Sequence, residues 1–167
     1  LTGVQPSPST VSRVHHTLAD EFARWKERPL LAHYLYVFAD GTYFTVIYNA
    51  EGQKMPVLAI IGVTPTGERE VLALSVGERE NQLAWEALLD DLHRRGLRTV
   101  GLWITDGNPA MLNALAVKFA DTPRQRCVKH KLDNVLAYVP KAQQAQVRPE
   151  LVALFYQPNR AHAEQAW

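Results

Sequence analysis

The sequence contains a single cysteine, Cys127, among 167 residues. One cysteine cannot form an intrachain disulfide, which excludes the small disulfide-stapled secreted domains and fits a reducing, cytoplasmic setting. Long apolar runs are lacking too, because none approaches the roughly 20 residues that span a bilayer. The first ten residues, LTGVQPSPST, show neither the basic start nor the apolar stretch of a signal peptide, and they lack an initiator methionine. We expect no membrane partner and a chain that is a piece of a longer protein.

A strong net charge is also missing, since 18 basic and 17 acidic residues leave a formal charge of +1 at pH 7. A nucleic-acid partner would therefore have to be bound by local basic patches, because the overall field is too weak to attract it. Hydrophobic residues make up 47% and charged residues 21% of the chain. This composition is typical of a folded soluble domain and excludes intrinsic disorder. The length suffices for one compact domain with a small appendage.

The first half of the chain predicts one helix and three strands. The helix begins near Ser7 and ends before Pro29, and it has one apolar stripe at helical spacing. The stripe consists of Val11, Val14, Leu18, Phe22 and Trp25. Segments 33–49, 54–64 and 69–76 are rich in β-branched and aromatic residues and are separated by short turns. They predict an antiparallel meander, whose first strand we expect to bulge at Gly41.

The second half predicts alternating helices and strands. Helical periodicity over residues 81–96 is followed by an apolar strand at 98–105, and a second helix follows. We expect Leu112, Leu115, Ala116 and Phe119 to form the buried stripe of that second helix. A short strand at 125–128, a helix that ends at Pro140 and further helix complete the order. Three antiparallel strands followed by alternating helices and parallel strands, with flanking helices, define an α/β protein with a ribonuclease H-like fold.

Two carboxylates occupy informative places in this order. Asp40 lies inside the first strand, and Asp106 follows the fourth strand in VGLWITDGNPAM. The first and fourth strands are neighbours in a ribonuclease H-like sheet, so the two side chains would meet at a site for a divalent metal, which prefers oxygen ligands. Each residue has an alternative role, because Asp-Gly is also a common turn dipeptide. Asn108 and Pro109 suit a helix start after such a turn, and the residues alone leave both interpretations open.

Four segments, taken in order, resemble the catalytic core of the Mutator-like transposases, the bacterial IS256 group. They are YLYVFADGTYF, VLAIIGVTPTGEREVLALSVGERENQLAWEALLDDLHRRGL, VGLWITDGNPAM and QRCVKHKLDNVLAYVPK. The resemblance implies a DDE transposase that uses Mg²⁺ or Mn²⁺ to cut and rejoin DNA. It assigns the first catalytic, metal-binding acid to Asp40 and the second to Asp106. It also matches Cys127 and His130 to the C-x-x-H signature of the group.

This chain departs from the family pattern at two places. Asp40-Gly41-Thr42-Tyr43 stands where the family usually has Asp-Ala-Thr-Tyr. The family's third acid, a Glu, lies well downstream of the C-x-x-H signature, and no residue of this chain matches it. The resemblance therefore implies a chain truncated before the third acid and inactive in strand transfer by itself. The implied partners are the element's terminal repeats and target DNA, and the intact enzyme is expected to be a homo-oligomer in the bacterial cytoplasm, associated with the nucleoid.

Two groups of residues are candidates for DNA contact. The segment SPSTVSR resembles the recognition helix of a helix-turn-helix module and would present Thr10, Ser12 and Arg13, although a helix that merely packs is the alternative. The segment RQRCVKHK concentrates basic side chains near the presumed metal site. They are Arg124, Arg126, Lys129 and Lys131, and a solvated surface is the alternative. Cys127 and His130 are only half of a zinc ligand set, which favours a structural role or a phosphate contact.

The predicted organisation has three parts. Residues 1–28 are the end of a helix-turn-helix-like DNA-binding region with a linker, residues 29–139 are a partial ribonuclease H-like catalytic core, and residues 140–167 begin a helical insertion. The alternative function is a non-catalytic DNA-binding or dimerising remnant of a transposase. A general nuclease of the ribonuclease H type is a third hypothesis.

Overall fold

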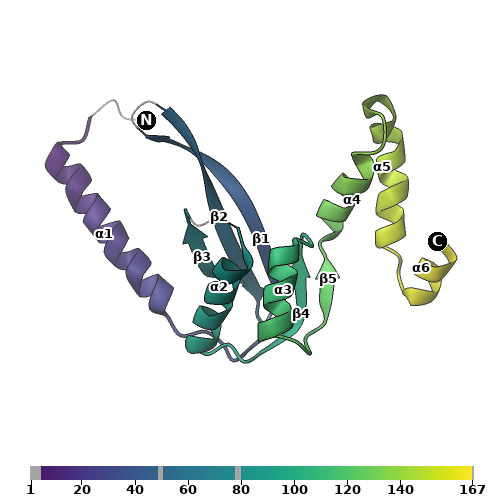
Figure 1. Cartoon of the computed structure of the whole chain (residues 1–167), viewed down its shortest axis with the longest axis horizontal. Coiled ribbons are helices and arrows are strands. Elements are labelled where there is room, and N and C mark those ends of the chain that lie inside the picture. The colour runs from purple at the N-terminus through teal and green to yellow at the C-terminus, as the bar shows by residue number, and fades with distance from the viewer. Residues whose placement is uncertain (1–4, 49–50, 78–79, 167) are drawn as a thin grey trace.

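A computed structural model describes residues 5–48, 51–77 and 80–166. Its centre is a five-stranded sheet in the order β3-β2-β1-β4-β5 (Figure 1). The strands are β1 (His33–Tyr48), β2 (Glu51–Val63), β3 (Arg69–Val76), β4 (Thr99–Thr105) and β5 (Arg124–Arg126). β1 pairs antiparallel with β2, and β2 with β3, whereas β4 is parallel to β1 and β5 is parallel to β4. This arrangement confirms the predicted ribonuclease H-like strand order.

The helices surround the sheet unevenly. They are α1 (Pro8–Glu27), α2 (Gln82–Arg94), α3 (Pro109–Lys118), α4 (Val128–Leu136), α5 (Lys141–Phe155) and α6 (Arg160–Ala166). Figure 1 shows α2 and α3 beside the sheet, α1 standing away on one side and α4 to α6 on the other. Among the described residues, no helix combines the length and apolar character needed to cross a membrane.

Alternation along the strands separates a covered face from an open face. Val37 of β1 and Trp103 of β4 are register partners, and both are completely buried under the helices. The residues that alternate with them on β1 point to the opposite face. There, Tyr36 is 45% and Phe38 is 39% exposed. The core thus lies on one side of the sheet, and the other side is open.

Local capping explains where the two core helices begin. Asn81 precedes α2 and its side chain accepts the Ala84 N–H, while Asn108 precedes α3 and accepts the Ala110 N–H. Such side chains satisfy donors that a helix start leaves unpaired. Pro109 occupies the first turn of α3, where a missing N–H is harmless.

The structure corrects the expected bulge in the first strand and part of the expected α3 stripe, and it leaves the apolar stripe of α1 outside the core. β1 is not bulged at Gly41, because its pairing with β2 continues unbroken from Tyr36 to Tyr48 and the irregularity lies between β2 and β3 at Ile60 and Ile61. The apolar stripe of α1 contains no buried residue, and Trp25 at its end is half-buried. The stripe of α3 is confirmed in part. Leu115 and Phe119 are buried as expected, but Met111 and Ala114 are buried in place of Leu112, which is half-buried, and Ala116, which is exposed.

Candidate functional site

Asp40 lies within β1 and not in a turn, which removes the alternative left open by its sequence. Its backbone pairs with Ala59 of β2 in the uninterrupted antiparallel ladder. By alternation its side chain belongs to the open face, and this side chain is 52% exposed. Long-range pairing of β1 with both neighbouring strands therefore sets the position of this carboxylate.

Asp106 lies in a turn and also directly after the end of β4. Ala39 pairs with Thr105 across β1 and β4, so Asp40 and Asp106 are the next residues on two adjacent strands. The Asp106 Oδ1 accepts the Asn108 N–H at 2.8 Å, which closes a turn ahead of α3. Gly107, at φ +86°, makes the reversal without a side-chain clash. The turn thus positions the carboxylate at the end of the strand.

Both aspartates line one pocket of about 350 Å³ on the open face of the sheet. Its other lining residues are Phe38, Ala39, Ile61, Arg69, Ile104, Cys127 and His130. The His130 Nε2 lies 4.0 Å from Asp40 Oδ2, and its Nδ1 is buried without a hydrogen-bond partner among the described residues. The predicted acid pair therefore shares a cavity with the two named residues of the C-x-x-H signature.

The C-x-x-H signature joins α4 to the end of β4. The Cys127 N–H donates to the Thr105 carbonyl at 2.6 Å, immediately before Asp106. His130 follows three residues later, one helical turn on, so its ring returns to the same pocket. This geometry favours a structural role for Cys127 and places His130 beside the acids.

Glu80 is a third acid at this end of the sheet, and the sequence interpretation missed it. Its carboxylate packs on Gly41, next to Asp40 in the chain. Burial raises the pKa of the Glu80 carboxyl above its usual range, and the charge of Asp106 and, to a smaller extent, that of Asp40 raise it further. The signal in the sequence was an acid directly before a helix N-cap, which by itself indicates only a favourable helix start.

The carboxylates of Asp40 and Asp106 fit a hard divalent cation. Mg²⁺ is commonly bound by one or two carboxylates, with waters and substrate phosphates completing its coordination. Among residues 5–48, 51–77 and 80–166, no group of three His, Cys, Asp or Glu side chains forms a ready metal cage. Structural zinc sites have four protein ligands, and Cys127 and His130 supply only two.

Three of the four basic residues near the site have intramolecular partners. Arg124 donates to the carbonyls of Leu115, Phe119 and Ala120 at the end of α3. Arg126 donates to the Asp106 carbonyl at 3.0 Å, and Lys129 pairs with Asp133 at 3.0 Å. Lys131 is exposed and makes no ion pair among the described residues.

The candidate DNA-contacting residues of α1 lie near its start, far from the sheet (Figure 1). The Thr10 hydroxyl is hydrogen-bonded to the hydroxyl of Ser7, the N-cap of α1, with 2.9 Å between the two oxygens. Ser12 and Arg13 are exposed. The structure therefore does not bring these residues together with the aspartates.

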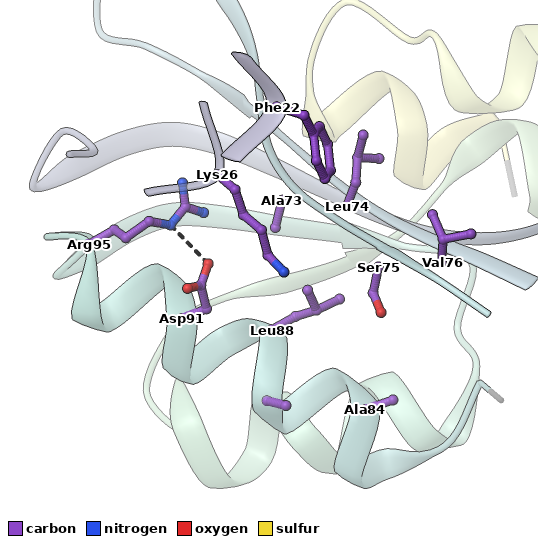
Figure 2. Close-up of a pocket in the computed structure, with 11 residues that line it drawn as sticks. Phe22, Lys26, Ala73, Leu74, Ser75, Val76, Ala84, Leu88, Asp91 and Arg95 are labelled. Atoms are coloured by element: carbon purple, nitrogen blue, oxygen red, sulfur yellow. Dashed lines mark hydrogen bonds and ion pairs between the residues drawn. The ribbon is translucent and has the colours of Figure 1, made fainter. Parts of the chain in front are cut away.

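A second cavity lies between α1, β3 and α2, away from both aspartates (Figure 2). Phe22 and Lys26 of α1 approach it from one side, and Leu88 of α2 lies opposite. Two charged residues that line this cavity, Asp91 and Arg95, form an ion pair, in which Arg95 Nε donates to Asp91 Oδ2 at 2.8 Å. The cavity therefore lacks the free carboxylate pair that distinguishes the first pocket.

Comparison with known proteins gives one matching family and several relatives. The family described as "Transposase, Mutator family" matches residues 1–167. The transposase for insertion sequence element IST2 of Acidithiobacillus ferrooxidans is 35% identical over 96% of this chain and 54% of its own length. The transposase for IS905 of Lactococcus lactis is 29% identical over 99% of this chain and 42% of its own length. The chain thus spans about half the length of these curated relatives or less.

Two further similarities are weaker or more distant. The transposase for IS256 in transposon Tn4001 of Staphylococcus aureus is 27% identical over 93% of this chain and 40% of its own length. A solved structure, the HTLV-2 integrase catalytic core domain in complex with magnesium, is 17% identical, with coverage of 79% of this chain and 90% of that one. The TM-score of this comparison is 0.37.

Proposed function

This chain belongs to the Mutator family of transposases, and we propose that it supplies the first two acids of a DDE active site that cuts and rejoins DNA. The observation that carries the proposal is the convergence of Asp40 and Asp106 on one pocket from two adjacent strands. The membership and this geometry arise from different evidence, namely overall sequence similarity and strand register. The first places the chain among transposases, and the second brings these two carboxylates to one pocket.

In this proposal Asp40 and Asp106 hold Mg²⁺ or Mn²⁺ by their carboxylate oxygens. A bound divalent metal supplies activation of an attacking water or hydroxyl and neutralises charge at the leaving oxygen. Asp106 is kept in place by the turn at Gly107, and Asp40 by its strand. No serine or cysteine nucleophile is needed. His130, 4.0 Å from Asp40, can donate to a phosphate oxygen when its ring is protonated.

DNA contacts are proposed for the exposed cations and hydroxyls. Lys131, Arg13 and Ser12 are exposed and suit phosphate contact, which is independent of base sequence. Arg124 and Arg126 are occupied by backbone carbonyls, and Lys129 by a carboxylate, so their contribution to DNA binding would be through the local positive field. The division at residues 28 and 139 into a DNA-binding end, a core and an insertion is part of the same proposal. So are the terminal repeats and target DNA as partners, a homo-oligomeric intact enzyme and a location at the nucleoid.

A metal titration with nicked terminal-repeat DNA tests the function. We expect Mg²⁺-dependent or Mn²⁺-dependent cleavage by the intact transposase, in which the third acid is present. D106N should abolish both cleavage and metal binding, because it replaces a charged oxygen ligand with a neutral amide. Metal binding itself is measured by calorimetry on this chain. DNA binding that needs no metal, with no cleavage and no metal binding, would support the alternative of a non-catalytic remnant. Cleavage confined to RNA–DNA hybrids would support a general nuclease of the ribonuclease H type.

A further inference from the structure

Glu80 reaches the candidate site through a space that exists because residue 41 is glycine. A Cβ at this position would lie 2.7 Å from the Glu80 Cδ and 2.8 Å from each carboxylate oxygen. Real Cβ atoms do not approach other atoms this closely, so any side chain at residue 41 would displace the carboxylate.

The ends of the strands bring Glu80 and the aspartates to one edge. β4 pairs with β1 only as far as Thr105, opposite Ala39, whereas β1 continues to Tyr48. Gly41 therefore lies where β1 has no β4 neighbour. Glu80 approaches this edge from the helix-covered face, and Asp40 and Asp106 belong to the open face. The geometric link is Gly41, which contacts the Glu80 carboxylate and directly follows Asp40 in β1.

One oxygen of the Glu80 carboxylate lacks a hydrogen-bond donor among the described residues. Its Oε1 is buried and accepts no hydrogen bond among the described residues. The buried Trp85 Nε1–H is also without a partner there, although the indole lies close enough to favour the charged carboxylate. A buried oxygen without a donor is costly, and a donor brought by a ligand would remove that cost. A cation's bound water is such a donor.

We propose that Glu80 is a positioning residue of the metal site, which accepts a hydrogen bond from a water on the cation held by Asp40 and Asp106. The inference rests on the proposed function, because it needs a metal at these aspartates. Gly41 serves the same role indirectly by leaving room for the carboxylate. The arrangement adds a third negative charge to the site without requiring a third direct ligand, in agreement with the absence of a three-residue cage among the described residues.

Calorimetric titration of the 167-residue chain with Mn²⁺ tests the inference without any DNA substrate. E80Q keeps the shape of the side chain and removes its charge, and we expect Mn²⁺ affinity to fall about tenfold, as for other partners of metal-bound groups. G41A should weaken affinity in the same direction by displacing Glu80. G52A is the matched control, since its Cβ would meet only the Thr45 methyl, at 3.3 Å, and it should bind Mn²⁺ as the wild type does. D106N should show the largest loss.

Urea unfolding without metal separates positioning from a purely structural role. Removal of one of three mutually repelling carboxylates should raise the unfolding midpoint of E80Q while its Mn²⁺ affinity falls. A lowered midpoint would overturn the inference, because it would show that the carboxylate serves the fold. Wild-type Mn²⁺ affinity in E80Q, with loss in D106N, would also overturn it and leave the proposed function standing. Wild-type affinity in D106N would instead refute the proposed function.

Discussion

Gly107 is the position at which one added methyl group should damage both the fold and the site. It lies directly after Asp106 and has a φ of +86°, a conformation that L side chains rarely adopt. A Cβ there would also lie 2.5 Å from Arg126 Nε and 2.8 Å from Arg126 Cζ. The guanidinium would have to move, although its Nη2 donates to the Asp106 carbonyl at 3.0 Å. G107A therefore combines backbone strain with the loss of a hydrogen bond at a proposed metal ligand.

The expected cost of G107A has two parts. The left-handed backbone conformation costs a non-glycine residue about 1 kcal/mol. Loss of the charge-assisted bond from Arg126 to the Asp106 carbonyl adds about 1 kcal/mol, discounted for its exposure. The sum is about 2 kcal/mol in the free energy of unfolding, which for a chain of this length corresponds to a Tm lower by about 4–8 °C.

G67A is the matched control for the backbone part. Gly67 has a φ of +89°, but a Cβ there would meet nothing within 4 Å. Urea unfolding should therefore show a loss of about 1 kcal/mol for G67A and about 2 kcal/mol for G107A. Calorimetry should show weaker Mn²⁺ binding for G107A only. Equal losses in the two variants, or unchanged Mn²⁺ affinity in G107A, would refute the claim that Arg126 and this turn hold Asp106 in place.

Four further predictions concern the core, the pH dependence of stability and two residues of the basic segment. W103A should lower the free energy of unfolding by about 4 kcal/mol in urea unfolding, because Trp103 is fully buried in the core. Burial lowers the pKa of His93, and the charge of Arg98 lowers it further. As the pH falls, His93 is therefore protonated in the unfolded chain before it is protonated in the folded one. The free energy of unfolding should decrease as the pH drops below about 6.5, the usual pKa of histidine. H93Q should flatten that fall in urea midpoints measured between pH 7 and 5. R124M should cost about 2 kcal/mol by freeing three helix-end carbonyls. K131A should leave stability unchanged. It should reduce the slope of log DNA affinity against log salt concentration by about one, because one phosphate contact is lost.

The sequence predicted most of the fold because its strong signals are local. The third strand, residues 69–76, and the helix that begins after Asn81 agree with β3 and α2. The apolar stripe of α1 shows the limit of such reasoning, because periodicity identifies an amphipathic helix without identifying what it packs against. Val14 and Leu18 are 50% and 59% exposed although their spacing is ideal for burial. Tertiary position, and not pattern, decides burial.

The site could be predicted only in part. Asp40 and Asp106 were selected because strand order implies adjacency, and the register confirms that they follow paired residues. Glu80 was missed because its place depends on where β4 stops, on the space at Gly41 and on the path into α2. None of these three features produces a periodic pattern in the amino-acid sequence. The occupation of Arg124 by carbonyls likewise depends on the tertiary fold. Composition alone favoured a solvated surface there, and the nearness of the presumed metal site favoured a DNA contact.

The two proposed ligands, Asp40 and Asp106, are held in position by different parts of the fold. Mutations can therefore affect one ligand without affecting the other. Asp40 depends on the pairing of β1 with two neighbouring strands, so a change that moves it must disturb the sheet. Asp106 depends on a turn of a few residues, closed by Asn108, that begins as β4 ends. Changes in the turn can therefore alter metal affinity through a loss of about 2 kcal/mol or less, whereas changes that break the backbone pairing of β1 around Asp40 should lower metal affinity and stability together. Stability and Mn²⁺ affinity, measured side by side, thus distinguish the two acids in a way that activity alone does not.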